Sequence, residues 1–244
     1  MNVYILHPYS ERFGLVAIAR APLGRRWLNW CVYWRRWRLR WRVESGAALK
    51  RASDIVGSIL FLLLFSPLFL VLALLIKFQD RGPVLFGQTR VGRFGEEFQM
   101  HKFRSMGLNA EAEFKDLLAQ NQHADGVTFK MKNDPRITRI GKWLRRFSLD
   151  ELPQFFDVLR GDMSLVGPRP PTPREVAIYS HADRRRLAVK PGLTCYWQVS
   201  GRSNIDFSGQ VKLDVQYIET ACLWVDLKLM IRTVRAVVIG NGAC

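Results

Sequence analysis

The chain is 244 residues long, and 48% of its residues are hydrophobic and 24% are charged. These values are typical of a folded domain with a packed core, so they exclude a chain that is disordered throughout. The formal net charge of +16 requires anionic partners, which are nucleic acid, anionic lipid head groups or phosphorylated substrates. The four cysteines are scattered without a C-x-x-C motif, so the sequence predicts neither a disulfide framework nor a zinc site.

Residues 1–49 form a basic arm. Eleven Lys and Arg residues stand against three Asp and Glu residues up to Asp54. Five tryptophans recur at spacings of 3, 4, 3 and 4, which places them on one stripe of a helix, with arginines on its other faces. The five are Trp27, Trp30, Trp34, Trp37 and Trp41. Because Trp prefers the bilayer interface and Arg pairs with lipid phosphates, we expect a helix in the membrane plane; a core or coiled-coil stripe is the alternative.

Residues 50–80 contain an uninterrupted apolar run from Ile55 to Ile76. At about 1.5 Å per residue this run is just long enough to cross a hydrocarbon core of about 30 Å. Near its middle, Pro67 removes one backbone hydrogen bond and, with Ser66, favours a sharp kink. Both flanks of the run are basic, so a segment that enters and leaves on the cytoplasmic side satisfies the positive-inside tendency. A kinked spanning helix is the alternative.

The remainder of the chain, residues 81–244, is predicted to fold as a mainly helical α+β domain. Alternating residues around Gly92 to Gly95 predict a β-hairpin. Amphipathic helical patterns follow it, and the final stretch is apolar on one face and ends at Gly240. The predicted helical ranges are 110–120, 140–146, 153–159 and 213–239.

The most informative block is LRRFSLDELPQ, residues 144–154, in which Asp150 and Glu151 are adjacent. Neighbouring residues on a helix point about 100° apart, so these carboxylates suit separate roles better than a shared proton. One of them is suited to attack phosphorus while the other holds Mg²⁺, which prefers carboxylate oxygens together with substrate phosphate.

A structural alternative for this block is a helix capping box formed by Ser148 and Glu151. Pro153 would then occupy the fifth helical position, where its ring clashes with the carbonyl four residues earlier. If Pro153 instead begins the helix, the acidic pair lies in the turn just before it. Both arrangements put the acids near a helix N-terminus, which favours phosphate.

Basic residues suited to phosphate surround the acidic pair in the sequence. Each of them alone is typical of a solvated surface, but a diphosphate and a lipid phosphate together need several, and arginine forks match their oxygens. The loop from Gly167 to Pro170 is rigid, so it either fixes Arg169 or serves as a turn between helices. The set is Lys102, Arg104, Arg136, Arg145, Arg146 and Arg169.

From about Lys50 to the C-terminus the chain resembles the monotopic phosphoglycosyl transferases, bacterial sugar transferases that prime capsule, exopolysaccharide and O-antigen assembly. Several long motifs in the same order carry the resemblance. They are KRASDIVGS, the mid-segment Ser66-Pro67, GPVLFGQTRVGRFGEEFQMHKFRSM, KNDPRITRIG, SLDELPQFFDVLRGDMSLVGPRP and KPGLTCYWQVSGRS. The chain departs from the family pattern at Cys195, because a glycine often follows the threonine there.

The resemblance implies a re-entrant membrane helix broken at Ser66-Pro67. It also implies a small cytosolic catalytic domain, with a β-hairpin and amphipathic interfacial helices, on the cytoplasmic face of the bacterial inner membrane with its anionic lipids. We therefore divide the chain into a basic arm (1–49), a re-entrant helix (50–80) and a catalytic domain (81–244).

The resemblance further implies a two-step, Mg²⁺-dependent reaction. Asp150 attacks the sugar-bearing phosphorus of a UDP-sugar and expels UMP, which leaves a phosphosugar-aspartyl intermediate. Polyprenyl (undecaprenyl) phosphate then takes the sugar-phosphate. In this pattern Glu151 is the metal ligand. The phosphate-facing residues are Lys102, Arg104, Arg145 and Arg169.

Two other functions compete with this one. The first is a membrane-bound glycosyltransferase that moves only the sugar and releases UDP. The second is nucleic-acid binding by the Arg/Trp arm, but a membrane segment follows directly and no known nucleic-acid motif is present, so we expect no nucleic-acid partner. The sequence leaves open the sugar, the polysaccharide pathway, the role of the arm and whether the chain forms a homo-oligomer.

Overall fold

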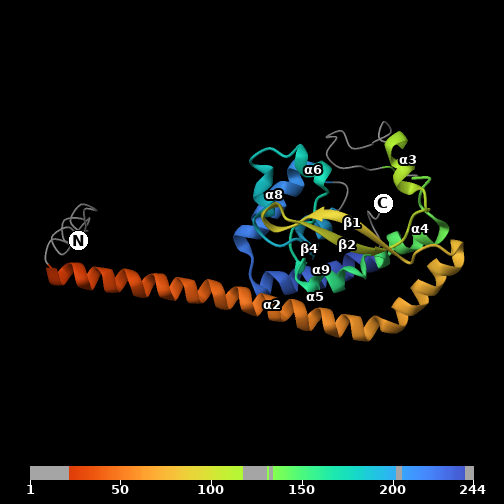
Figure 1. Ribbon diagram of the computed structural model, residues 1–244. Coiled ribbons are helices and arrows are strands. Elements are labelled where there is room, and N and C mark those ends of the chain that lie inside the picture. The colour runs from red at the N-terminus through yellow and green to blue at the C-terminus, as the bar shows by residue number, and fades with distance from the viewer. Residues whose placement is uncertain (1–21, 118–130, 132–133, 202–204, 240–244) are drawn as a thin grey trace, which may run out of the picture. The chain divides into compact units, whose positions relative to one another are not determined.

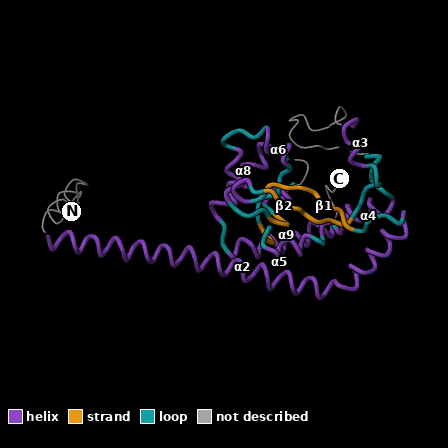
Figure 2. Tube along the Cα trace, in the orientation of Figure 1, coloured by secondary structure: helices purple, strands orange, loops and turns teal. Residues whose placement is uncertain are grey.

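A computed structural model describes residues 22–117, 131, 134–201 and 205–239 (Figure 1, Figure 2). The chain divides into two compact units, Met1–Lys50 and Arg51–Cys244. Helix α2 (Pro22–Asp80) begins in the first unit, so the helix predicted for the basic arm is confirmed from residue 22 onward. The tryptophan stripe lies outside the described side chains except for Trp30, which is exposed. Its position in a membrane stays a prediction.

The part of α2 in the second unit carries the apolar run. By length and composition the stretch Gly46–Asp80 is able to cross a membrane, and most of its side chains are not buried in the protein. The helix remains continuous through Pro67 and bends within its apolar part (Figure 1). The expected break is thus a bend, because proline removes only one backbone hydrogen bond. The Ser66 hydroxyl donates to the Leu63 carbonyl at 2.9 Å inside this stretch.

Polar contacts fasten both ends of the apolar run to the same domain. At the first end, Arg51 donates to the carbonyl oxygens of Val158 and Leu159 at 2.5 and 2.7 Å. The buried Asp54 carboxylate accepts hydrogen bonds from the Ser164 hydroxyl and the Leu165 amide, both at 3.1 Å. At the other end, the Asp80 carboxylate pairs with the guanidinium of Arg104.

Between these ends the helix packs through aromatic and aliphatic side chains. Phe61 stacks on Phe155 with ring centroids 3.9 Å apart, and Phe69 contacts Phe103 and Phe156. One buried apolar cluster combines the helix with the domain. Its members are Leu72, Ile76, Phe103, Leu144 and Leu152.

The predicted β-hairpin is confirmed. Strand β1 (Leu85–Val91) pairs antiparallel with β2 (Glu97–Phe103) around the short 3-10 turn η1 (Arg93–Gly95). In this register Phe86 faces Lys102, and Arg90 faces Phe98. Because side chains alternate across a strand, Arg90 and Lys102 lie on the same face of the hairpin.

Short helices follow the hairpin along the chain. The predicted helices at 140–146 and 153–159 are confirmed by α4 and α5. The helix predicted at 110–120 is confirmed by α3 as far as Leu117, and the rest of that range lies outside the described residues. The elements are α3 (Ala110–Leu117), α4 (Arg139–Arg146), η3 (Leu149–Glu151), α5 (Gln154–Arg160), α6 (Pro173–Ala177), η4 (Asp183–Ala188) and α7 (Tyr196–Ser200).

A second, parallel sheet joins β3 (Ser164–Val166) to β4 (Gly192–Thr194). The backbones approach closely just beyond this pairing, since a Cβ on Gly192 would lie 2.0 Å from the amide nitrogen of Gly167. Only glycine fits at such a contact. The sheet therefore fixes the loop that carries Arg169, and the loop follows a strand instead of linking two helices.

The single helix expected at 213–239 is wrong, because two helices occupy this region. Helix α8 (Phe207–Thr220) ends before α9 (Leu223–Ile239) begins. The Tyr217 hydroxyl donates to the carbonyl oxygen of Val166 and lies 2.9 Å from the carboxylate of Asp226, at the start of α9. Tyr217, Val166 and Leu229 belong to the same buried cluster, so the break lets both helices cover the β3–β4 sheet.

We expect the ion pair between Asp80 and Arg104 to stabilise the attachment of α2. In a double-mutant cycle with Asp80→Asn and Arg104→Met, the coupling in the free energy of unfolding should be about 1–3 kcal/mol, because the guanidinium is buried. The hydrogen bond from Arg104 lowers the pKa of Asp80 despite the opposing effect of burial. Its contribution is therefore present at neutral pH and lost as the pH falls through the lowered pKa.

The measurement is urea unfolding of the protein in detergent micelles at pH 7 and at acidic pH. Lys142→Met, at an exposed position on α4, is the control and should leave stability nearly unchanged. Additive effects of the two substitutions at Asp80 and Arg104 would contradict the prediction.

Candidate active site

The acidic pair lies in η3, the turn between α4 and α5. Ser148 adopts a left-handed conformation with φ of 53° and makes no side-chain capping bond, so the capping box is not formed. Pro153 instead stands at the N-cap of α5 with φ of −61°. The structure thus confirms that Asp150 and Glu151 lie in the turn before the helix, as expected when Pro153 begins it.

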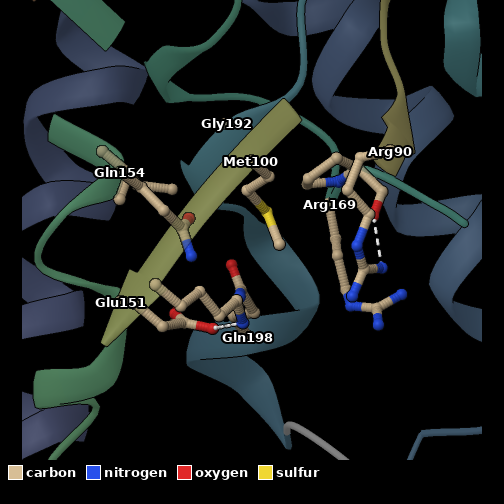
Figure 3. Close-up of a pocket in the computed structure, with 10 residues that line it drawn as sticks. Arg90, Met100, Glu151, Gln154, Arg169, Gly192 and Gln198 are labelled. Atoms are coloured by element: carbon tan, nitrogen blue, oxygen red, sulfur yellow. Dashed lines mark hydrogen bonds and ion pairs between the residues drawn. The ribbon is translucent and has the colours of Figure 1, made fainter. Parts of the chain in front are cut away.

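A polar cavity opens beside this turn, and four separate parts of the chain line it (Figure 3). The hairpin, the acidic turn with the start of α5, the Arg169 loop and the β4–α7 segment each contribute side chains. The lining residues are Arg90, Met100, Lys102, Glu151, Gln154, Arg169, Pro170, Gly192, Leu193 and Gln198.

The charges around the cavity shift the pKa values of the two carboxyl groups in opposite directions. The Lys102 ammonium bonds Glu151 at 2.8 Å. Burial favours the neutral form of Glu151, but Lys102, with Arg169 and Arg90, outweighs burial and holds the pKa of this carboxyl below its usual range. Burial raises the pKa of Asp150, and although Lys102 opposes this, the neighbouring charge of Glu151 adds to it. Two adjacent carboxyls with pKa values pushed apart are suited to different chemical roles.

Three of the residues expected to act in the site line the cavity, namely Lys102, Glu151 and Arg169. Asp150 is buried directly beside Glu151 in the same turn. Arg145 is not a lining residue: its guanidinium Nε donates to the Ser105 hydroxyl at 3.0 Å, although its charge acts on Asp150.

Arg104 lies elsewhere, contrary to the expectation that it faces phosphate. Its guanidinium is committed to Asp80 and to the carbonyl of Pro83. Arg104 lies just past the end of β2, where the chain meets the last turn of α2, and its partner Asp80 belongs to that turn. Ser66 and Pro67 are exposed in the apolar part of α2 and belong to the membrane segment, not to this cavity.

Sequence reasoning missed several lining residues, of which Arg90, Gln154 and Gln198 are polar. The alternation of the hairpin would have found Arg90, because it shares a face with Lys102. Gln154 is buried, and its amide nitrogen has no hydrogen-bond partner. Such a donor in a cavity is typical of a group that contacts a ligand.

The departure at Cys195 is compatible with this site. Its backbone is extended, with φ of −152°, so the position does not require glycine. The buried thiol donates to the side-chain oxygen of Gln198 at 3.3 Å. Cys195 therefore orients one of the residues that line the cavity.

The side chains present fit an Mg²⁺ ion that the protein and the substrate would coordinate together. Within the described ranges, no group of three or more His, Cys, Asp and Glu side chains gathers in one place. Mg²⁺ commonly takes only one or two protein carboxylates, and substrate phosphates and water complete its coordination. The Lys102 ammonium lies beside the Glu151 carboxylate, so a positive charge is already accommodated at this position.

Residues 45–240 match the model of a family described as bacterial sugar transferases. The chain belongs to this family. The match covers the apolar part of α2, the acidic turn and every segment that lines the cavity. The family resemblance stated from the motifs is thereby confirmed.

Several characterised proteins are similar to this bacterial sugar transferase. The chain is 51% identical over 80% of its length to the galactosyl transferase CpsE of Streptococcus agalactiae serotype III, and 45% identical over 82% to the undecaprenyl-phosphate galactose phosphotransferase of Salmonella typhimurium. It covers only 43% and 42% of those two proteins. It is also 40% identical over 81% of its length to the exopolysaccharide production protein ExoY of Rhizobium meliloti, of which it covers 89%.

Proposed function

We propose that this sugar transferase moves a sugar-1-phosphate from a UDP-sugar to undecaprenyl phosphate, as the priming step of exopolysaccharide, capsule or O-antigen synthesis. The observation that carries the proposal is the pair Asp150-Glu151, whose pKa values are pushed apart at a cavity lined by Lys102, Arg90 and Arg169. Relatives named as undecaprenyl-phosphate galactose and glucose phosphotransferases support the acceptor class, and a relative named UDP-N-acetylgalactosamine-undecaprenyl-phosphate N-acetylgalactosaminephosphotransferase supports a UDP-sugar donor.

In the first step, an Asp150 carboxylate oxygen attacks the phosphorus that bears the sugar. A bond forms between this oxygen and phosphorus while the bond to the oxygen of UMP breaks, and UMP leaves with the electron pair. In the second step, a phosphate oxygen of the lipid attacks the same phosphorus and releases the Asp150 carboxylate. The nucleophile must be ionised to attack, and Lys102 and Arg145 favour that form against burial.

The other groups of the site stabilise charge. When bound, Mg²⁺ supplies a positive charge that neutralises phosphate oxygens during transfer. Glu151 is suited to hold it, because Lys102, Arg169 and Arg90 keep this carboxyl ionised despite burial. Lys102 lies within 2.8 Å of Glu151, where its ammonium is available to a phosphate oxygen of the substrate.

We also propose that α2 is re-entrant and that the domain lies on the cytoplasmic face of the inner membrane. Both ends of the apolar run contact one domain, Arg51 and Asp54 at one end and Asp80 at the other. A spanning helix would separate these ends by about 30 Å of hydrocarbon. Exposed aromatic residues with basic neighbours on α4 and α9, such as Trp143 and Trp224, suit an interface with anionic lipid head groups.

The rival reaction moves the sugar alone and releases UDP. We expect UMP, and we expect Asp150→Asn to abolish its release, because an amide cannot act as the nucleophile. Asp162→Asn, a nearby substitution outside the cavity, should retain activity. The measurement is nucleotide chromatography after incubation of the protein in detergent with a panel of UDP-sugars, Mg²⁺ and undecaprenyl phosphate. UDP as the product, or full UMP release by Asp150→Asn free of wild-type protein, would overturn the assignment.

The pH dependence should report the charge of Asp150. Its raised pKa places the acid limb of activity at a higher pH than an ordinary aspartate would give. Lys102 opposes the shift, so Lys102→Met should move the acid limb to still higher pH while it lowers the maximal rate. The measurement is kcat/KM for UMP release against pH, with exposed Lys142→Met as the control. An acid limb that stays in place or moves to lower pH would contradict this electrostatic account.

If α2 is re-entrant as proposed, reporters at residue 2 and at the C-terminus should both lie in the cytoplasm. Pro67→Leu restores a backbone hydrogen bond and should straighten the helix, so part of the population should shift to a spanning form with lower activity. Cysteine-accessibility labelling in intact cells and in inverted vesicles measures both effects. Labelling of the two ends from opposite sides in the unaltered protein would establish a spanning helix.

A further inference from the structure

Four arginine side chains of the described residues are buried, and Arg90 differs from the other three. Arg104 pairs with Asp80, Arg136 with Asp134 and Arg186 with Asp214. Arg90 has no carboxylate within ion-pair distance in the described part of the chain, and its guanidinium bonds only neutral oxygens. Burial of a cation without a paired anion is unfavourable, and an anionic ligand at Arg90 would offset this cost.

The hydrogen bonds of Arg90 leave donors available at the cavity. Its Nε and Nη2 donate to the side-chain oxygen of Gln88, and its Nη1 donates to the carbonyl of Pro170. A guanidinium has five N–H donors, so these three contacts leave one on each terminal nitrogen. Two such donors form the fork that fits the oxygens of a phosphate.

Arg169 supplies a second positive charge beside Arg90. Figure 3 shows both side chains on one side of the cavity, across from Glu151 and Gln154. Burial, and after it the charge of Arg169, lowers the pKa of Arg90 to about 9, as expected when a cation faces a like charge. Arg169 reaches Glu175 only at 3.4 Å, and the Glu175 carboxylate also accepts the amide of Thr172 at 2.7 Å. The carboxylates of Glu175 and Glu151 favour the charged form of Arg90, but neither forms an ion pair with its guanidinium.

The geometry of phosphoryl transfer determines which phosphate group would bind to Arg90 and Arg169. Attacking and leaving oxygens lie roughly in line through the reacting phosphorus. When Asp150 attacks, the nucleotide phosphate leaves on the side opposite to Asp150. The lipid phosphate must in turn attack opposite to Asp150, which is the side that the nucleotide phosphate has just vacated.

We propose that Arg90 and Arg169 form one phosphate site that holds the nucleotide phosphate in the first half-reaction and the lipid phosphate in the second. The inference rests on the proposed two-step function and deepens it. It adds Arg90 as a substrate-binding residue and makes UMP and the lipid acceptor compete for the same guanidinium groups. The contact from Arg90 to Pro170 also ties the hairpin to the Arg169 loop, so the pair acts as a unit.

The test compares Arg90→Gln with Arg93→Gln in the full chain. Arg93 is exposed in the turn of the same hairpin and does not line the cavity, so it is a matched control for the loss of one positive charge. One arm measures equilibrium binding of radiolabelled UMP, with uridine as a phosphate-free competitor. The other arm measures KM for undecaprenyl phosphate at saturating UDP-sugar. Both are run in detergent at fixed ionic strength.

We expect Arg90→Gln to weaken UMP binding and raise KM for undecaprenyl phosphate by about tenfold or more each, since a charge-assisted hydrogen bond is lost. Uridine binding should not change, whereas a distorted loop would weaken uridine and UMP alike. Arg93→Gln should alter neither quantity. A change in only one of the two quantities would overturn the shared site, and no change in either would overturn the role of Arg90.

These outcomes separate the inference from the function on which it rests. If unaltered protein releases UDP, the proposed reaction fails whatever Arg90 does. If it releases UMP and Arg90→Gln binds UMP and the lipid phosphate normally, the reaction stands and the shared site fails.

Discussion

The ion pair between Lys102 and Glu151 is the contact on which the site depends. It joins the hairpin to the acidic turn, so two segments 49 residues apart meet at the cavity. It also affects the pKa of both acids, because Lys102 is the largest influence that opposes burial at both Asp150 and Glu151. Without a cation at this position, burial would favour the neutral forms of both adjacent carboxyls more strongly.

The membrane helix contacts the same elements that carry the site. Arg51 bonds the last turn of α5, whose first residue is Gln154. Asp54 bonds β3, which leads into the Arg169 loop, and Asp80 bonds Arg104 just after the strand that carries Lys102. The helix thus contacts three segments that line the cavity or lead into its lining: α5, the strand before the Arg169 loop, and the residue that follows β2.

Much of the fold and the site follows from local patterns. The hairpin follows from alternation, and the position of the acids before α5 follows from the geometry of Pro153. Lys102, Glu151 and Arg169 were found because their residue types suit phosphate and metal. Arg104 has the same chemistry, yet its charge is used at Asp80, and residue type alone does not separate an arginine that binds a ligand from one that holds a helix in place. The parallel β3–β4 sheet was missed because its strands have three residues each, too few for a periodic signal.

The sequence by itself determined the family, the apolar segment and the acidic pair, because long motifs, a hydrophobic run and adjacent carboxylates are properties of residues close together in the chain. The tertiary structure alone decided which cations reach the cavity, since Arg90, Lys102 and Arg169 come from segments that local spacing does not relate. It also decided the directions in which the pKa values of Asp150 and Glu151 shift. A pKa depends on burial and on charges brought near by the fold, and neither exists before the chain has packed.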